Sequence, residues 1–120
     1  KLLEYVDDYS QHPFPELLRL EVPVALSTDD RGMWDSNLSD EFFVAVKEFN
    51  LSWEEINTLN ENSINFGFMD DITKQSLLEK YRSNMAKFER RYKAKGLDGV
   101  KKTMPKHGGF ICRHYSLCSK

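Results

Sequence analysis

Cysteine is scarce in this sequence. Only two of the 120 residues are cysteines, Cys112 and Cys118, and both lie near the C-terminus. Two late cysteines do not form the framework of a disulfide-rich secreted domain. We therefore favour a cytoplasmic location.

Long apolar runs are also missing. The longest stretches, such as Phe42 to Val46, are far shorter than the ~20 apolar residues that cross a bilayer. No basic segment followed by an apolar one opens the sequence as a signal peptide would. We expect no membrane partner.

Charge is divided unevenly along the chain. The formal net charge is −2, but residues 101–120 hold five Lys/Arg and no acid, so residues 1–100 carry 12 basic and 19 acidic side chains, a net of −7. An acidic body argues against nucleic acid as a partner. The glycines at and beyond Gly96 and the absence of periodicity predict a basic, poorly ordered tail over 96–120 after a domain over 1–95.

One strand and several helices are expected. Val22–Ser27 is an almost continuous apolar run, typical of a strand covered on both faces. Helical spacing predicts a short helix up to Leu20, one starting near Ser39, one starting at Ser52 with an S-x-x-E capping box, and a long one from Asp70 or Asp71 to Gly96. A single strand needs neighbours for its backbone N–H and C=O groups. With Lys1 at its start, the sequence is expected to be a section of a longer chain.

Two adjacent acids, Asp29 and Asp30, follow the expected strand directly. The carboxyl ends of strands in α/β folds carry ligands and catalytic groups. Successive side chains of an extended segment point to opposite sides, so the two carboxylates would have different roles. The alternative is a turn or helix cap. The run from Asp29 lacks the pattern of an EF-hand calcium loop.

The residues around these acids resemble the adenosine deaminase family. The similarity runs in order over about residues 5–92 and is carried by these segments: His12–Pro15, Val22–Val24, Ser27–Gly32, Asn37–Phe42, Leu51–Glu55, Asn62–Ile64, and Leu77, Leu78 and Phe88 in the last helix.

The resemblance implies an α/β fold, the C-terminal segment of a (β/α)8 TIM barrel with its last strand and the following helices. It implies a zinc-dependent hydrolase, with Zn²⁺ as cofactor, that removes the 6-amino group of a purine nucleoside or nucleotide. Asp29 matches the family's zinc-ligand aspartate, and Asp30 matches the aspartate that contacts purine N7. His12 matches a helix start rather than a ligand.

The resemblance also shows what this sequence does not contain. The family's H-x-H pair, its later zinc histidine, its H-A-G-E glutamate and its second catalytic histidine have no counterpart here, so the 120 residues alone are expected to be inactive. Arg31 replaces a common proline, and a basic residue there resembles the branch that takes N6-methyl-AMP. Nucleoside and nucleotide substrates therefore both stay open, as does the oligomeric state.

Two other interpretations remain. The chain could be a non-catalytic helical interaction module in which the acidic pair caps a helix. In the tail, His107, Cys112, His114 and Cys118 are four ligand-type residues, but their spacing matches no standard structural zinc pattern.

Overall fold

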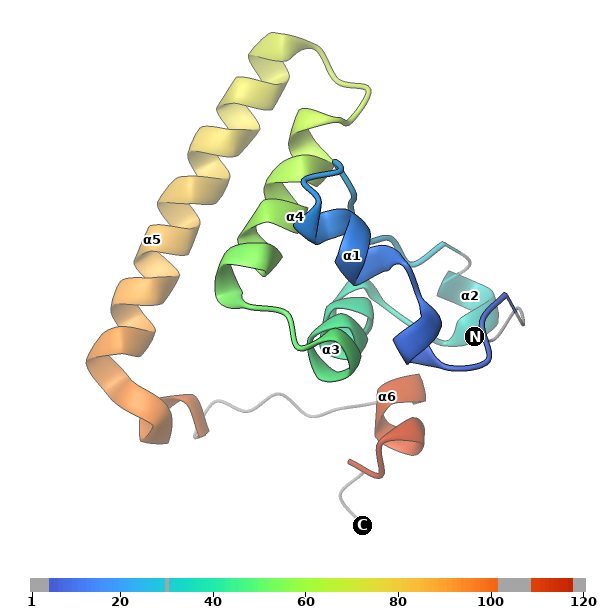
Figure 1. Cartoon of the computed structure of the whole chain (residues 1–120). Helices are drawn as coiled ribbons and strands as arrows, with labels where there is room; N and C mark the ends of the chain where they lie inside the picture. Colours follow the sequence, from blue (N-terminus) through green and yellow to red (C-terminus); the bar gives the residue numbers. More distant parts are fainter. Residues whose placement is uncertain (1–4, 30, 102–108, 118–120) are drawn as a thin grey trace. The chain divides into compact units, whose positions relative to one another are not determined.

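The computed structural model describes residues 5–29, 31–101 and 109–117 (Figure 1). These residues are mostly helical, and none of them is in a β-strand. In chain order the elements are the 3₁₀ helix η1 (Tyr9–Gln11), α1 (Phe14–Arg19), α2 (Arg31–Trp34), α3 (Leu38–Phe49), α4 (Trp53–Asn65), α5 (Asp71–Lys101) and α6 (Gly109–His114).

The structure divides into two units. One combines Lys1–Gly67 with Gly108–Lys120, and the other is Phe68–His107. The first therefore includes α1 to α4 and α6, and the second includes α5. The division of the chain into 1–95 and 96–120 stays a prediction.

Capping boxes begin the two central helices. At α4, the Glu55 N–H donates to Ser52 Oγ (3.1 Å), and the Ser52 N–H donates to Glu55 Oε2 (2.8 Å), which confirms the sequence prediction. At α3 the cap is Asn37, paired in the same way with Asp40, so the helix begins at Leu38, one residue before the expected start near Ser39. Asn37 takes the cap because its side-chain oxygen reaches the Asp40 N–H at 3.1 Å.

The core of the first unit lies where α1, α3 and α4 meet (Figure 1). Its buried members are Phe14, Leu18, Ala45, Leu51 and Leu59, with partly buried side chains packed against them. Leu59 is 1% exposed, whereas Trp53, the first residue of α4, is 38% exposed because it lies at the helix end.

The strand expected at Val22–Ser27 is not confirmed. Residues 22–28 have neither helix nor strand, because no second strand exists among the described residues to form a ladder. Instead, the Val24 carbonyl accepts a hydrogen bond from Asn62 Nδ2 on α4 (2.9 Å), and Val24 and Leu26 pack against the core. The (β/α)8 barrel therefore stays a prediction.

The second unit contains the long helix α5. Asp70 caps it, since its Oδ1 accepts the Thr73 N–H at 2.9 Å. The expected stop at Gly96 appears as a break, with non-helical angles at that residue (φ 60°, ψ −170°), after which the helix resumes. Within the described residues, no helix combines the length and apolar character needed to span a bilayer.

Candidate functional site

Asp29 lies in a tight turn before α2. Its N–H donates to Ser27 Oγ (3.3 Å), and its carbonyl accepts the Arg31 N–H (3.1 Å). Its φ of 46° is in the left-handed region, which Asp tolerates better than most residues. The carboxylate is exposed and, among the described residues, has no hydrogen-bond or ion-pair partner. Among the described residues, the Asp29 side chain therefore caps no helix.

Asp30 lies outside the described residues, so its predicted contact with the purine stays a prediction. Asp29 is thus the one predicted site residue that lies within the part of the chain that the structure describes.

The fit to zinc is incomplete on this chain. A carboxylate oxygen is an accepted zinc ligand, and the exposure of Asp29 leaves it accessible. A protein zinc site uses at least three such ligands, however, and the described residues contain no group of three His, Cys, Asp or Glu side chains that could hold a metal. These residues do not hold zinc without further ligands. His107 and Cys118 lie outside the described residues, so the four-residue cluster of the tail stays untested.

The segment after Asp29 is fixed by the start of α3. Arg31–Trp34 form the single turn α2, and Asp35 follows with a φ of 51°. The buried Ser36 hydroxyl donates to the Glu41 carboxylate, and Asn37 forms the capping box described above. We call residues 31–37 the site loop, because they connect Asp29 to the rigid helix α3.

The tail helix α6 contacts this same loop, which the sequence did not predict. Arg113 Nη2 lies 2.7 Å from Asp35 Oδ2, and α6 packs against α3. The Tyr115 hydroxyl donates to Glu48 Oε1 at 2.7 Å, and its ring centroid lies 5.3 Å from that of Phe43. The only signal in the sequence was the opposite charge of the tail and the body.

Burial raises the pKa of Tyr115, and its hydrogen bond to Glu48 adds to the effect. The pKa of Tyr9 is raised in the same way, by burial first and then by Glu48. In both cases burial disfavours the charged phenolate most, and the nearby Glu48 carboxylate disfavours it further. They indicate that α6, α3 and η1 share one polar cluster around Glu48.

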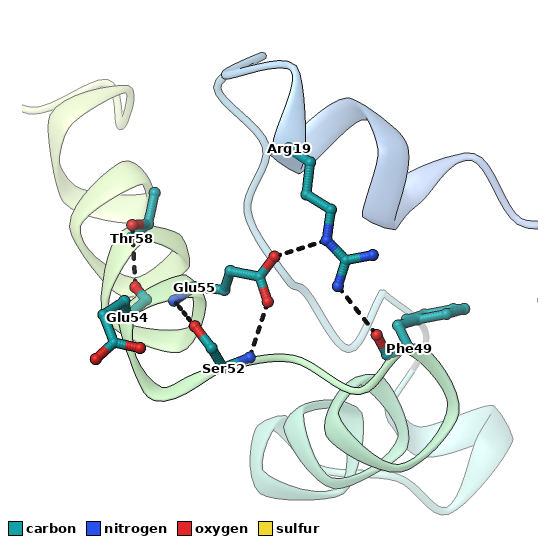
Figure 2. A network of polar contacts seen from close by, with 6 residues as sticks. All are labelled: Arg19, Phe49, Ser52, Glu54, Glu55 and Thr58. Carbon is teal, nitrogen blue, oxygen red and sulfur yellow. Dashed lines mark hydrogen bonds and ion pairs between the residues drawn. The ribbon is translucent and has the colours of Figure 1, made fainter.

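A second polar network joins α1 to α4 (Figure 2). Arg19 Nε donates to Glu55 Oε1 at 2.8 Å, and Arg19 Nη2 donates to the Phe49 carbonyl at 3.2 Å. The Arg19 contact and the Ser52 N–H together lower the pKa of Glu55. Arg19 connects α1 to the end of α3 and to α4, Ser52 and Glu55 cap α4, and the Thr58 hydroxyl donates to the Glu54 carbonyl within α4, so the role of the network is structural.

A cavity of about 410 Å³ opens beside the network. Its lining includes Leu18, Val22, Glu55, Asn62 and Phe66. It lies on the α1–α4 side of residues 22–28, and Asp29 does not line it. The cavity and the exposed carboxylate are therefore separate features.

Comparison with known proteins identifies the family. The adenosine deaminase family model matches residues 2–84, more than half of the chain, and the matched segment includes Asp29 and Asp30. The chain belongs to the adenosine deaminase family.

Several curated proteins are similar over the same part of the chain. The N6-methyl-AMP deaminase of Homo sapiens is 34% identical over 76 residues, which are 63% of this chain and 21% of that protein. The adenosine deaminase of Clostridium acetobutylicum is 36% identical over 75 residues, 62% of this chain and 22% of that protein. The adenine deaminase of Chelativorans sp. is 27% identical over 81 residues, which are 68% of this chain and 25% of that protein.

The chain thus spans only about a fifth to a quarter of the length of these relatives. No solved structure gives a significant match.

Proposed function

We propose that this chain is the C-terminal section of a zinc-dependent aminohydrolase that replaces the 6-amino group of a purine nucleoside or nucleotide by oxygen. The single observation that supports this most is the family match over residues 2–84, which includes the acidic pair. The exposed and unpartnered carboxylate of Asp29 among the described residues agrees with a ligand role.

In this proposal Asp29 supplies one oxygen ligand to zinc, and the remaining ligands come from chain outside this sequence. A bound zinc ion supplies hydroxide near neutral pH by lowering the pKa of a water molecule. The Asp29 carboxylate also orients the water, and Asp30 fixes the purine ring when its carboxyl is protonated and donates a hydrogen bond to N7. Overall, water adds at C6 and the amine leaves.

Exposed apolar side chains support the view that a longer chain covers this one. Leu20 is 67% exposed, Val22 is 40% exposed and Phe66 is 62% exposed, and the last two line the cavity. All three lie near the ends of residues 22–28 or of α4, where the neighbouring strands of a barrel would pack. The 120-residue chain alone is therefore expected to bind a hydrophobic dye and to be inactive.

The test uses the longer protein that contains this chain. Asp29→Ala is expected to lose both zinc, measured by elemental analysis, and turnover. Asp30→Ala is expected to keep zinc and lose turnover. Asp7→Ala is the matched control, since Asp7 is an exposed acid in the same unit whose substitution leaves the site loop untouched. Full activity in both site variants would refute the assignment.

The substrate is identified with a panel of adenosine, AMP, N6-methyl-AMP and adenine. The resemblance carried by Arg31 and the similarity to N6-methyl-AMP deaminase make the nucleotide the first choice. If instead the 120-residue chain melts cooperatively as a monomer and binds little dye, the non-catalytic helical module becomes the better interpretation.

A further inference from the structure

The helix α6 lies beyond the part of the chain that matches the family. The family model ends at residue 84, whereas α6 is Gly109–His114. Ile111 is completely buried and Cys112 is 8% exposed, so this short helix is docked and not solvated. An isolated helix of this length is unstable in water, so docking must stabilise it.

We propose that α6 is an intramolecular strap that holds the site loop in position, with Arg113 as a positioning residue that acts through Asp35. The inference rests on the proposed function, because it assigns importance to the loop that follows Asp29 and Asp30. It adds a contact from a segment outside the family match.

Two residues of α6 hold Asp35 from one side. Gly109 and Arg113 are four positions apart and so lie on one face of the helix. Arg113 Nη2 binds Asp35 Oδ2 at 2.7 Å. A Cβ atom at Gly109 would lie 2.9 Å from the Asp35 carbonyl oxygen, closer than real contacts allow, and at a tight 3.2 Å from both carboxylate oxygens. The approach of α6 to the loop therefore requires glycine, which also has a φ of 55°.

The strap is anchored at its other end on α3. Tyr115 bonds Glu48 and packs edge-on against Phe43. Because the start of α3 also binds the loop, through Ser36–Glu41 and the Asn37 capping box, the loop is held from two sides. If the contacts with α6 are lost, the site loop keeps its contacts with α3.

The two parts of the strap contribute differently. Both partners of the Arg113–Asp35 pair are more than 60% exposed, so the pair supplies little affinity. Buried Ile111 and the Tyr115 contacts supply the docking, and the pair sets where the loop lies. Removing Arg113 should therefore loosen the loop without releasing α6. Small displacements of a catalytic group can reduce rates by large factors.

The experiment uses the longer protein and measures amide hydrogen exchange together with steady-state kinetics. In Arg113→Ala, exchange over residues 31–37 is expected to rise about two- to fivefold, as for one exposed ion pair, while exchange in α4 stays unchanged. The kcat is expected to fall more than KM rises, with zinc content unchanged. Arg113→Lys, which restores the cation, is expected to recover most of the kcat.

Three further variants sharpen the test. Asp35→Asn removes the charge while keeping a residue that tolerates positive φ, and Arg113→Ala in that background should have no additional effect. Gly109→Ala should raise exchange over the same residues through steric displacement. Lys80→Ala, an exposed cation on α5 in the other unit, is the control for the change in net charge and should match the unmodified protein.

The outcomes separate the two proposals. Unchanged exchange over residues 31–37 in both Arg113→Ala and Gly109→Ala overturns the strap. Raised exchange with unchanged kcat in an active enzyme overturns the positioning role of Arg113. If the unmodified protein deaminates none of the purines, the proposed function has failed, and the exchange result alone decides whether α6 holds the loop.

Discussion

Substitutions at Glu55 separate the two contacts of its carboxylate. One oxygen accepts the Arg19 Nε at 2.8 Å, and the other accepts the Ser52 N–H at 2.8 Å (Figure 2). Glu55→Gln keeps an oxygen for the capping box but removes the charge that binds Arg19. Glu55→Ala removes both the oxygen of the capping box and the charge that binds Arg19. The difference between the two variants therefore measures the helix cap alone.

The exposure of the two side chains sets the magnitudes. The Arg19 side chain is 52% exposed and that of Glu55 is 22% exposed, so the ion pair contributes at most about 1 kcal/mol. A capping contact contributes about 1 kcal/mol more. Glu55→Gln should thus lower the free energy of unfolding by up to about 1 kcal/mol, and Glu55→Ala by about 2 kcal/mol. Arg19→Ala, which also frees the Phe49 carbonyl, should cost about 1 kcal/mol.

The pH dependence has a defined sign. Because the folded-state pKa of Glu55 lies below its ordinary value of 4.5, the ion pair stabilises the fold fully above that value. The contribution is lost as the pH falls through the lowered pKa. Unmodified protein and Glu55→Gln should therefore differ at neutral pH and converge in acid.

The assay is urea unfolding followed by tryptophan fluorescence, because Trp53 is the first residue of α4. Amide exchange in the first turn of α4 provides a local measure. Arg19→Ala and Glu55→Gln share one contact, so the double variant should cost less than the sum of the two. Additive effects within about 0.3 kcal/mol, or equal costs for Gln and Ala at position 55, would refute this account of the network.

Two further predictions concern the core and the strap. Leu59 is 1% exposed at the centre of the core, so Leu59→Ala should lower the free energy of unfolding in urea by about 3 kcal/mol. Leu59→Met, which nearly conserves the volume, should lower it by less than about 1.5 kcal/mol. Similar values for both variants would mean that the side chain is not tightly packed. The raised pKa of Tyr115 means that its stabilising effect is complete below the ordinary value of 10.0 and is lost as the pH rises beyond it. Amide exchange in α6 should then increase in alkali in the unmodified protein and show no such alkaline step in Tyr115→Phe, with Tyr5→Phe, an exposed tyrosine, as the control.

Local sequence signals predicted the helices well where one residue alone could supply the cap. Ser52 and Glu55 form the expected box, and Asp70 begins the long helix that breaks at Gly96. At α3 both Asn37 and Ser39 are good caps, and the choice depends on which reaches the backbone N–H three residues later. Propensity does not distinguish the two.

Tertiary contacts of the tail could not be read from the sequence. Residues 109–117 have no helical periodicity long enough to identify, and the helix exists because Ile111 is buried and Tyr115 reaches Glu48. Gly109 looked like a sign of irregular structure. In the structure its lack of a side chain permits the close approach of α6 to Asp35.

The candidate site shows a different limit. The order of residues around Asp29 was enough to identify the family, but nothing in the geometry of Asp29 distinguishes a metal ligand from an ordinary surface acid, because its carboxylate has no partner among the described residues. A metal site is defined by the convergence of several ligands, and one carboxylate fixes neither its position nor its charge. Residues 22–28 have the same property, since an apolar segment becomes a strand only when a second strand pairs with it. The proposed zinc site and the predicted sheet therefore both depend on residues beyond the described ones, whereas the site loop that follows Asp29 contacts α3 and α6 in this structure.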